Sequence, residues 1–553
     1  MALSRNEIAP LYYQIMRRVF YFCAVAVLIG ISCVKENPTT EPSKQEEKQD
    51  TPEEKPEDKP VFQLDVNGRV DVVSGASTLK VNVTTNLGGF EPYSEAAWIH
   101  VQEKAQDSFT LAFDENPNTS ARNANVWVAA PSRAAMKDLL SFSVIQAAHE
   151  IDFTEQQTDK NGTSNCYLLP DAGLYSFSAK VKGNGKGCDG LNAPSALNPK
   201  GAKLVWQSKK GFITEVSLKD GRILAKVEKT AANAVIAATD ASGNIIWSWH
   251  LWCPGFTIDE KPVIDGTIMD VNLGVTSNNF KQSVEAYGLL YQWGRKDPFP
   301  GSPIRNNGTI YTKNIPVYDI KGSEVTIGST SMYNSTNNTL AFSIANPSTC
   351  ISNNAQKDKT GDWLRPQESN DAMWGNPKGY VKPEEGEQAA EGSKTYYDPC
   401  PVGWRVPHTR VFKHFTESGG YSWATGETEG VLTFYDLGGE AYFAAVDINE
   451  DGNINLLDFV DGWWFYTHPE KQDYSYFPAT TRYDGSYAMF MGSMVGLWGN
   501  YWYNSPSDPN DAAGRSKALS FSIMNYSHEY EITASPASNG SRADAYPIRC
   551  MKE

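Results

Sequence analysis

Residues 61–149 alternate short apolar runs with polar turn residues, and this pattern predicts secondary structure directly. The runs are V-F-Q-L-D-V, L-K-V-N-V, W-I-H-V, F-T-L-A-F, A-N-V-W-V and F-S-V-I-Q. Short strands at such regular spacing, without a long helical periodicity, are typical of a β-sandwich. We therefore predict that residues 61–149 form an immunoglobulin-like β-sandwich.

Residues 151–257 carry a second set of strand patterns, including G-L-Y-S-F-S-A-K-V, A-K-L-V-W, N-A-V-I-A-A-T and I-I-W-S-W-H-L-W-C. The sequence D-A-S-G-N at residues 240–244 predicts a hairpin turn between the last two, because Gly and Asn accept positive φ at little cost. These patterns predict a second β-sandwich module. His250 lies among three tryptophans of the last run, and we interpret it as a packed strand residue rather than a ligand.

The N-terminus has the layout of an export signal. Arg17 and Arg18 precede an apolar run at residues 19–30, and a Ser-Cys pair follows, ending at Cys33. The run is shorter than the roughly 20 apolar residues that a permanent membrane helix needs. Its end resembles a bacterial lipobox, in which Cys33 would be lipidated and become the first residue of the mature chain. The alternative is a simple secretory signal with an incidental cysteine.

Residues 34–60 are dense in Pro and Glu and nearly devoid of apolar side chains. Such a segment buries too little apolar surface to fold, and charged Pro-rich linkers stay extended. We predict that residues 34–60 form a disordered tether. It would join residues 1–33, the signal peptide with its lipobox, to the folded region. The formal net charge of −16 disfavours nucleic acid, whose binding requires basic patches. We expect no nucleic-acid partner.

Six cysteines remain for the folded region once Cys23 and Cys33 are set aside. They are Cys166, Cys188, Cys253, Cys350, Cys400 and Cys550. None has the close C-x-x-C spacing of a zinc site. An oxidising compartment outside the cytoplasm would permit disulfides among them.

The sequence D-I-N-E-D-G-N-I-N-L-L-D at residues 447–458 matches the spacing of an EF-hand calcium loop. Oxygen ligands at positions 1, 3, 5, 7, 9 and 12 surround one hard cation, and Gly at position 6 permits the sharp turn. The candidate ligands are Asp447, Asn449, Asp451, Asn453, Asn455 and Asp458. A structural Ca²⁺ is the corresponding cofactor prediction. The alternative is an Asx-rich hairpin, because residues 459–467 read as a strand rather than a helix.

Aromatic residues gather near the C-terminus, and Trp498, Tyr501 and Trp502 are the candidate ligand-binding residues. Exposed aromatic faces stack on sugars or anchor protein interfaces. The alternative is that these side chains fill the core. Catalysis has little support, since none of the seven His lies in a metalloprotease helix or beside a nucleophile elbow. We predict that the protein is not an enzyme.

Two regions resemble known families. A-W-I-H-V at residues 97–101, F-D-E-N at residues 113–116 with Arg122 beyond, and V-I-Q at residues 144–146 resemble a BACON domain. That family consists of immunoglobulin-like modules in surface proteins of gut Bacteroidota. The resemblance implies a spacer, or else a carbohydrate-binding module.

Residues 258–553 carry a series of longer motifs. They include Y-G-L-L-Y-Q-W-G-R-K-D-P-F-P-G, N-D-A-M-W-G-N-P, Y-D-P-C-P-V-G-W-R-V-P, G-N-Y-W-Y-N-S-P and P-I-R-C. Together they resemble the FISUMP family of fimbrial and surface lipoproteins, and residues 151–257 resemble the β module that precedes it in fimbrillin-like proteins. The resemblance implies an α+β C-type-lectin-like domain closed by a disulfide between Cys400 and Cys550. The chain departs from the family at Tyr503-Asn504 and at Cys350.

These observations predict a mainly β multidomain protein with two immunoglobulin-like β-sandwiches followed by an α+β C-type-lectin-like domain. The expected location is the outer membrane of a Gram-negative bacterium, with a lipid anchor and the folded part facing the exterior. The expected function is adhesion, as a non-catalytic adhesin or a fimbrial accessory or tip component. Its partners would be surface glycans or proteins of the host or of bacteria, or fimbrial subunits. The alternative is a surface glycan-binding lipoprotein of a polysaccharide-utilisation system.

Overall fold

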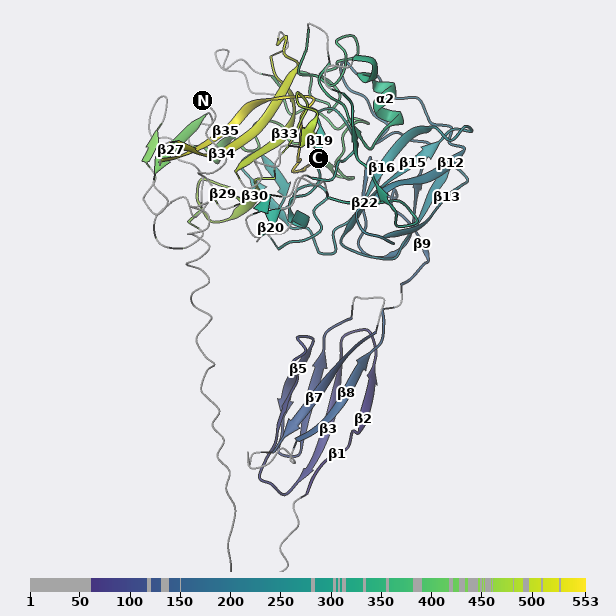
Figure 1. Cartoon of the computed structure of the whole chain (residues 1–553), viewed down its shortest axis with the longest axis vertical. Helices are drawn as coiled ribbons and strands as arrows, with labels where there is room; N and C mark the ends of the chain where they lie inside the picture. The colour runs from purple at the N-terminus through teal and green to yellow at the C-terminus, as the bar shows by residue number, and fades with distance from the viewer. Residues whose placement is uncertain are drawn as a thin grey trace, which may run out of the picture. The chain divides into compact units, whose positions relative to one another are not determined.

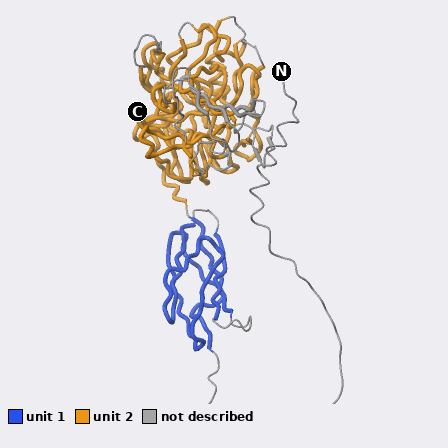
Figure 2. Tube along the Cα trace, turned by 90° about the vertical axis from the view of Figure 1, so that its left-hand side faces the viewer, with its two compact units in different colours: residues 1–150 blue, residues 151–553 orange. Residues whose placement is uncertain are grey.

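The computed structural model divides the chain into two compact units, Met1–Glu150 and Ile151–Glu553, shown in different colours in Figure 2. It describes residues 61–553 except 117–120, 131–138, 150, 280–283, 302–304, 307–308, 311–314, 332–334, 355–357, 381–389, 417–420, 427–432, 436–445, 448–449, 451, 453–458, 460, 481, 491–496, 509–510 and 527–528. The export signal, Cys33 and the predicted tether therefore lie outside the described residues.

The first unit, called unit 1, is a β-sandwich of two four-stranded sheets, ordered β1-β3-β6-β5 and β2-β8-β7-β4. Its strands are β1 (Phe62–Leu64), β2 (Gly68–Val72), β3 (Ser77–Thr85), β4 (Glu91–Tyr93), β5 (Ile99–Lys104), β6 (Ser108–Phe113), β7 (Arg122–Ala129) and β8 (Leu139–Gln146). Alternate residues of β3, β6, β7 and β8 point inward and form one apolar core. The predicted β-sandwich is confirmed.

One end of this sandwich is fastened by the motif residues around Arg122. Its guanidinium donates to the backbone oxygens of Asp114 and Glu115 at 2.7 and 2.9 Å, and its Nε donates to Gln146 Oε1 at 2.8 Å. The Arg122 guanidinium also lies 4.4 Å from the ring centroid of Trp98, which packs against the core. These residues therefore have structural roles in unit 1.

The second unit, called unit 2, begins with two sheets, ordered β10-β16-β15-β12-β22-β23 and β13-β14-β11-β9. Their strands are β9 (Glu155–Gln157), β10 (Cys166–Leu168), β11 (Gly173–Ser178), β12 (Gly201–Gln207), β13 (Ile213–Lys219), β14 (Arg222–Val227), β15 (Ala232–Thr239), β16 (Ile245–Cys253), β22 (Val317–Tyr318) and β23 (Glu324–Val325). The predicted turn at residues 240–244 joins β15 to β16, and Gly243 there has a φ of 83°.

The rest of unit 2 is built of shorter strands and one large sheet, ordered β28-β27-β35-β34-β33. That sheet consists of β27 (Ser422–Gly426), β28 (Thr433–Tyr435), β33 (Trp498–Pro506), β34 (Arg515–Tyr526) and β35 (Glu529–Ser541). The paired shorter strands are β17 (Glu260–Val263), β18 (Gly266–Met269), β19 (Tyr291–Gln292), β20 (Arg305–Asn306), β21 (Thr309–Ile310), β24 (Gly328–Ser329), β25 (Thr349–Cys350), β26 (Trp404–Arg405), β29 (Gly462–Tyr466), β30 (Tyr474–Pro478), β31 (Tyr483–Asp484), β32 (Met489–Phe490), β36 (Ala545–Tyr546) and β37 (Met551–Lys552). In Figure 1, β33, β34 and β35 lie on one side of unit 2 and β12, β15 and β16 on the other.

Helix is scarce in the described part of unit 2. The helix α2 (Leu340–Ala345) lies beside β16 (Figure 1), and the short 3-10 helices are η2 (Val284–Ala286), η3 (Ser335–Asn337) and η5 (Lys413–Phe415). Within the described residues, no helix has the length and the apolar character that crossing a membrane requires. The chain is a mainly β multidomain protein, as predicted.

The predicted boundary near residue 257 lies inside unit 2 rather than between two compact units. Buried side chains from both sides of it share one apolar core, which extends from Cys166 to Cys550. Asn165 Nδ2 donates to the backbone oxygens of Tyr396 and Asp398 at 2.7 and 2.9 Å, and its Oδ1 accepts from Trp247 Nε1 at 3.0 Å. Because polar and apolar contacts both cross the boundary, residues 151–257 and 258–553 form a single folded body.

Residues 396–407 hold this body to the C-terminus. Cys400 and Cys550 form the predicted disulfide, with Cα atoms 6.0 Å apart, and both side chains are fully buried. Just beyond it, β26 pairs with β37. The Lys394 ammonium donates to the backbone oxygens of Cys400 and Pro401 at 2.7 and 2.6 Å. A covalent bond and hydrogen bonds therefore converge where the chain ends.

Candidate functional site

Two of the three predicted ligand-binding aromatics lie in the core, which corrects that prediction. Tyr501 and Trp502 are both 0% exposed. The Tyr501 hydroxyl donates to Pro478 O at 2.7 Å, and Trp502 Nε1 donates to Tyr291 O at 2.7 Å. Strand β33 is buried on both faces over most of its length, so consecutive aromatic side chains pack inward on either side. Neither ring is available to stack on a ligand.

Trp498, at the start of β33, is the predicted aromatic that reaches the surface in part. Its side chain is half-buried, and the Arg482 guanidinium lies 5.4 Å from the centroid of its ring. One half-buried ring beneath an arginine presents little open aromatic face. The role of Trp498 in ligand binding therefore stays a prediction.

The predicted calcium loop is described only in part. Asp447, Glu450 and Gly452 are described, whereas Asn449, Asp451, Asn453, Asn455 and Asp458 lie outside the described residues. Gly452 N donates to Asp447 Oδ2 at 2.8 Å, and Gly452 has a φ of 85°. This hydrogen bond joins positions 1 and 6 of the motif across a tight turn, which a calcium loop and an Asx-rich hairpin both require. The cation remains a prediction.

A solvent-open polar pocket of about 280 Å³ lies at the edge of the large sheet of unit 2. It is lined by Tyr380, Ser507, Asp508, Asp511, Arg515, Lys517 and Asn539. Its volume is near the lower limit of roughly 300 Å³ for small-molecule sites in proteins. We call it the Tyr380 pocket and consider it a candidate site for ligand binding.

The floor of the Tyr380 pocket is a short polar network. Asp511 Oδ2 accepts from Ser507 Oγ and from Arg515 Nε, both at 2.8 Å. Its Oδ1 accepts from Ala513 N at 2.9 Å, which closes a turn before β34. Burial by itself would raise the pKa of Asp511. The hydrogen bonds that it accepts, of which the one from Arg515 has the largest effect, lower the pKa by more, so it lies below its ordinary value. Asp511 is therefore ionised and holds the turn in place.

The wall of the pocket combines one aromatic ring with charged side chains. The Tyr380 hydroxyl donates to Asp508 Oδ2 at 3.2 Å, and the Lys517 ammonium lies 5.6 Å from the centroid of the Tyr380 ring. Burial, and then the charge of Arg515, lower the pKa of Lys517. The pocket thus offers hydroxyl, carboxylate, ammonium and guanidinium groups around an aromatic ring.

The strand geometry of β34 and β35 explains why these groups meet. Arg515 and Lys517 are two residues apart on β34, so they share one face, while Ser516 between them is fully buried. Asn539 on β35 pairs directly with Lys517. Gly514, with a φ of 62°, leads into β34 where a Cβ atom would lie 2.9 Å from Lys359 O. The turn before the pocket therefore requires glycine.

Sequence analysis did not find the Tyr380 pocket. The motif G-N-Y-W-Y-N-S-P ends just before Ser507, and Arg515 and Lys517 show the alternation of a strand with one polar face. Tyr380, however, lies more than 120 residues before Asp508 in the sequence. Only the folded chain brings that aromatic ring to the two cations.

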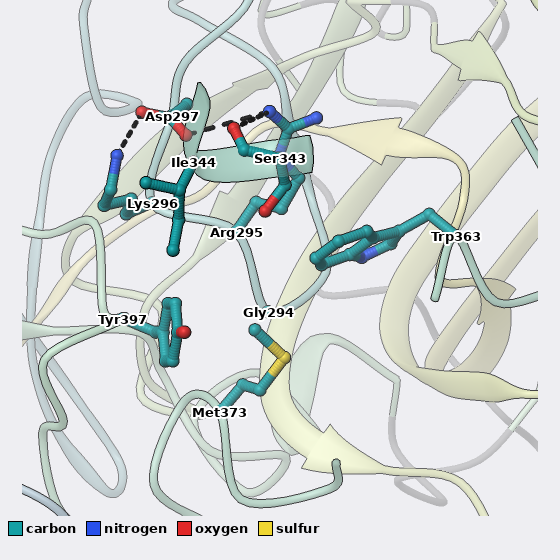
Figure 3. Close-up of a pocket in the computed structure, with 9 residues that line it drawn as sticks. All are labelled: Gly294, Arg295, Lys296, Asp297, Ser343, Ile344, Trp363, Met373 and Tyr397. Carbon is teal, nitrogen blue, oxygen red and sulfur yellow. Dashed lines mark hydrogen bonds and ion pairs between the residues drawn. The ribbon is translucent and has the colours of Figure 1, made fainter. Parts of the chain in front are cut away.

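A second cluster of charges surrounds a small cavity of about 10 Å³ formed by the R-K-D motif (Figure 3). Arg295, Lys296 and Asp297 are each at most 3% exposed. The Lys296 ammonium lies 2.5 Å from Asp297 Oδ1, and burial lowers its pKa. The Arg295 guanidinium donates to Thr349 O at 2.8 Å and approaches Ser343 O at the end of α2. The cavity has room for about one water molecule, so this cluster serves packing rather than ligand binding.

His250 is a packed strand residue, as the sequence predicts. It is 1% exposed, and one ring nitrogen lies 2.8 Å from Asn233 Oδ1. Burial lowers its pKa to about 3. A neutral imidazole enclosed in this way has no access to a substrate.

Asp265, Glu391 and His408 bring three possible metal ligands within 4.8 Å of one another. Arg410 already lies between the carboxylates, with Nε 2.6 Å from Asp265 and Nη2 2.7 Å from Glu391. Arg405 lies 3.6 Å from Glu391 as well. Two guanidinium groups therefore balance the two carboxylates, and a divalent cation would have to displace them.

Comparisons with known proteins do not assign a family. No protein-family model and no curated protein matches the chain. Among solved structures, a Bacteroides thetaiotaomicron protein is 14% identical, with a TM-score of 0.14, over 16% of this chain and 88% of its own. A xyloglucanase from Bacteroides ovatus is 11% identical, with a TM-score of 0.14, over 18% of this chain and 21% of its own. SporoSAG from Toxoplasma gondii is 11% identical, with a TM-score of 0.13, over 33% of this chain and 94% of its own. At these TM-scores the likenesses carry no argument about function.

Proposed function

We propose that the protein is a lipid-anchored surface protein that binds an extracellular partner through unit 2 without catalysing a reaction. The observation that carries the binding role is the Tyr380 pocket, which is open to solvent and rests on the paired strands β34 and β35. Binding groups held on paired strands are positioned more precisely than groups on loops. In this proposal unit 1 is a BACON-like spacer, and the part of unit 2 from residue 258 onward has a C-type-lectin-like fold.

The proposal of a non-catalytic role rests on where the reactive groups lie. Ser248 Oγ lies 2.5 Å from the Lys296 ammonium and donates to Asp297 Oδ1 at 2.6 Å, an arrangement able to activate a nucleophile. Ser248 is nevertheless 1% exposed. Since a substrate cannot reach Ser248, we assign a structural role to Ser248, Lys296 and Asp297. Adhesion or fimbrial assembly is the leading function in this proposal.

A second candidate function is the capture of glycans for a polysaccharide-utilisation system. The Tyr380 pocket favours it, because an aromatic wall surrounded by hydroxyl, amide and charged groups suits a polyhydroxylated ligand. A fimbrial partner would instead dock through a strand edge or an exposed apolar patch. The two candidates therefore predict different ligands for the same unit.

The anchoring part of the proposal is tested by cell fractionation of the Cys33→Ala variant. We expect the wild-type protein in the outer-membrane fraction, labelled by a palmitate analogue and accessible to protease on intact cells. Cys33→Ala should lose the label and the anchoring, whereas the matched control Cys23→Ala, inside the apolar run, should keep both. A cytosolic wild-type protein, or label that survives Cys33→Ala, contradicts the anchor.

The binding part is tested with the soluble ectodomain, residues 34–553, on a glycan array and a panel of host surface proteins. We expect saturable binding to at least one member, which disappears when Tyr380 and Lys517 are replaced together by alanine. Binding to proteins, fimbrial subunits or cell-surface glycans supports the first candidate, and binding only to polysaccharides that serve as nutrients supports the second. The absence of any saturable binding contradicts both.

A further inference from the structure

We propose that the Tyr380 pocket binds a sugar that carries a carboxylate, a hexuronate unit, whose carboxylate lies between Lys517 and Arg515. This inference rests on the proposed binding function and names the chemical class of the ligand. The pocket supplies three independent observations, which are the spacing of its cations, the engagement of its own carboxylates and the size of its opening.

The two cations stand on the same face of β34, two residues apart. Alternate residues of a strand are separated by about 7 Å, which two long side chains bridge easily around one carboxylate. Arg515 uses Nε for Asp511, and its terminal nitrogens have no hydrogen-bond partner among the described residues. The side chain is 45% exposed, so these donors are accessible to a ligand. A planar guanidinium binds a carboxylate through two parallel hydrogen bonds.

The anionic groups of the pocket are already engaged with protein donors. Asp511 accepts hydrogen bonds from Ser507, Ala513 and Arg515. Asp508 accepts from the Tyr380 hydroxyl. The environment of Lys517 disfavours its charge, because burial and the nearby Arg515 outweigh the attraction of Asp508 and Asp511. A ligand carboxylate would therefore meet accessible guanidinium donors of Arg515, whereas a cation would compete with protein donors for Asp511.

The remaining features favour a sugar acid over a bare carboxylate. At about 280 Å³, the pocket is larger than a carboxylate group and close to the lower limit for small-molecule sites. Asn539 offers an amide oxygen and nitrogen for hydroxyl groups beside the Tyr380 ring. A single monosaccharide unit with one carboxylate satisfies the cations, the acceptors and the volume together.

Sugars that differ only at one carbon provide the test. The ectodomain is titrated with sodium glucuronate and galacturonate, and with glucose and galactose, which have CH₂OH in place of the carboxylate. Protein NMR or calorimetry reports the binding. We expect at least one uronate to bind at least tenfold more tightly than its neutral counterpart and more tightly than acetate. A neutral sugar that binds as tightly as its uronate, or acetate that binds as tightly as either uronate, overturns the inference.

Variants locate the site. Lys517→Met and Arg515→Gln should each weaken uronate binding at least tenfold, whereas Lys517→Arg should restore most of it. Lys80→Met removes an exposed lysine from β3 of unit 1 and should leave binding unchanged. Melting curves check that each variant is folded. If Lys517→Met does not fold, the loss of uronate binding in Arg515→Gln is the test of the site. Uronate binding that survives both substitutions overturns the site. A glycan array positive only for neutral sugars sinks this inference while leaving the proposed function standing.

Discussion

The bond between Cys400 and Cys550 should be the largest single contribution to the stability of unit 2. It joins residues 150 positions apart, so the unfolded chain without it gains the freedom of a long loop. In the chain-entropy model a loop of this length is worth about 5 kcal/mol, and observed losses for native disulfides are roughly 2–5 kcal/mol. We predict that Cys400→Ala with Cys550→Ala lowers the free energy of unfolding of unit 2 by about 2–5 kcal/mol.

Alanine is the appropriate replacement because the local hydrogen bonds involve backbone atoms. Ser164 Oγ and the Lys394 ammonium both donate to Cys400 O, which the double variant retains. Cys350→Ala measures the packing lost with one sulfur atom, half of that lost in the double variant, since Cys350 is fully buried and free. That control should cost about 1 kcal/mol, because it removes a small buried side chain without removing a cross-link.

Urea unfolding followed by tryptophan fluorescence measures the effect. Thirteen of the 15 tryptophans lie after residue 150, so the fluorescence reports mainly on unit 2. Both sulfurs are buried, so reductant should act on the wild type only where unit 2 unfolds. Mass mapping of the oxidised protein confirms the bond beforehand. A double variant that unfolds at the same urea concentration as Cys350→Ala would refute the argument.

Three further predictions concern other parts of unit 2. Trp502→Ala should lower the free energy of unfolding by about 3–5 kcal/mol, because it empties a fully buried site. Trp498 is half-buried, so Trp498→Ala should lower the free energy of unfolding far less in the same urea experiment. Equal losses in the two variants would contradict the burial argument. Burial raises the pKa of Asp544 from 3.8 to about 6, so the folded state favours the protonated carboxyl. The stability that the protonated carboxyl contributes is fully present below pH 3.8 and is lost, by about 3 kcal/mol, as the pH rises through 6. Unfolding measured from pH 3.5 to 7 should therefore show a smaller fall in stability for Asp544→Asn than for the wild type, and parallel curves would contradict the assignment. Calorimetric titration should detect Ca²⁺ binding at residues 447–458 that Asp447→Asn abolishes, and a titration without heat, together with a melting temperature that chelator leaves unchanged, would remove the calcium prediction.

Local patterns predict the strands of unit 1 well because each sheet has one face toward a single core. The apolar alternation of β3, β6, β7 and β8 appears both in the sequence and in the buried positions. The pattern misses β2 and β4. The first is G-R-V-D-V, which has only two apolar side chains, and the second is an edge strand of three residues with a central Pro, a position where strands tolerate proline. Both strands offer too few apolar positions for the alternation to be recognised in the sequence.

Unit 2 is harder to predict because its decisive contacts join distant segments. The boundary expected at residue 257 is crossed where Trp247 packs on Tyr396 and Tyr397, with ring centroids 6.2 and 5.8 Å apart. The aromatic content of β33 shows that a strand is present but not which faces are covered, and β33 is covered on both. The disulfide is the exception, because family resemblance rather than periodicity indicated it. The Tyr380 pocket has no local signature, since it depends on a partner more than 120 residues away.

The buried cations of unit 2 explain how a body with so much irregular chain stays folded. Loops that enter a core carry backbone carbonyls that must find donors. Lys394 donates to Cys400 O and Pro401 O, Arg295 to Thr349 O, and Arg549 to Tyr476 O at 2.7 Å. Burial lowers the pKa of each of these cations, which shows that their desolvation is only partly offset. Each of these side chains stabilises the fold by donating hydrogen bonds to loop carbonyls inside the core. The regular strands β34 and β35, in contrast, present the exposed groups of the Tyr380 pocket.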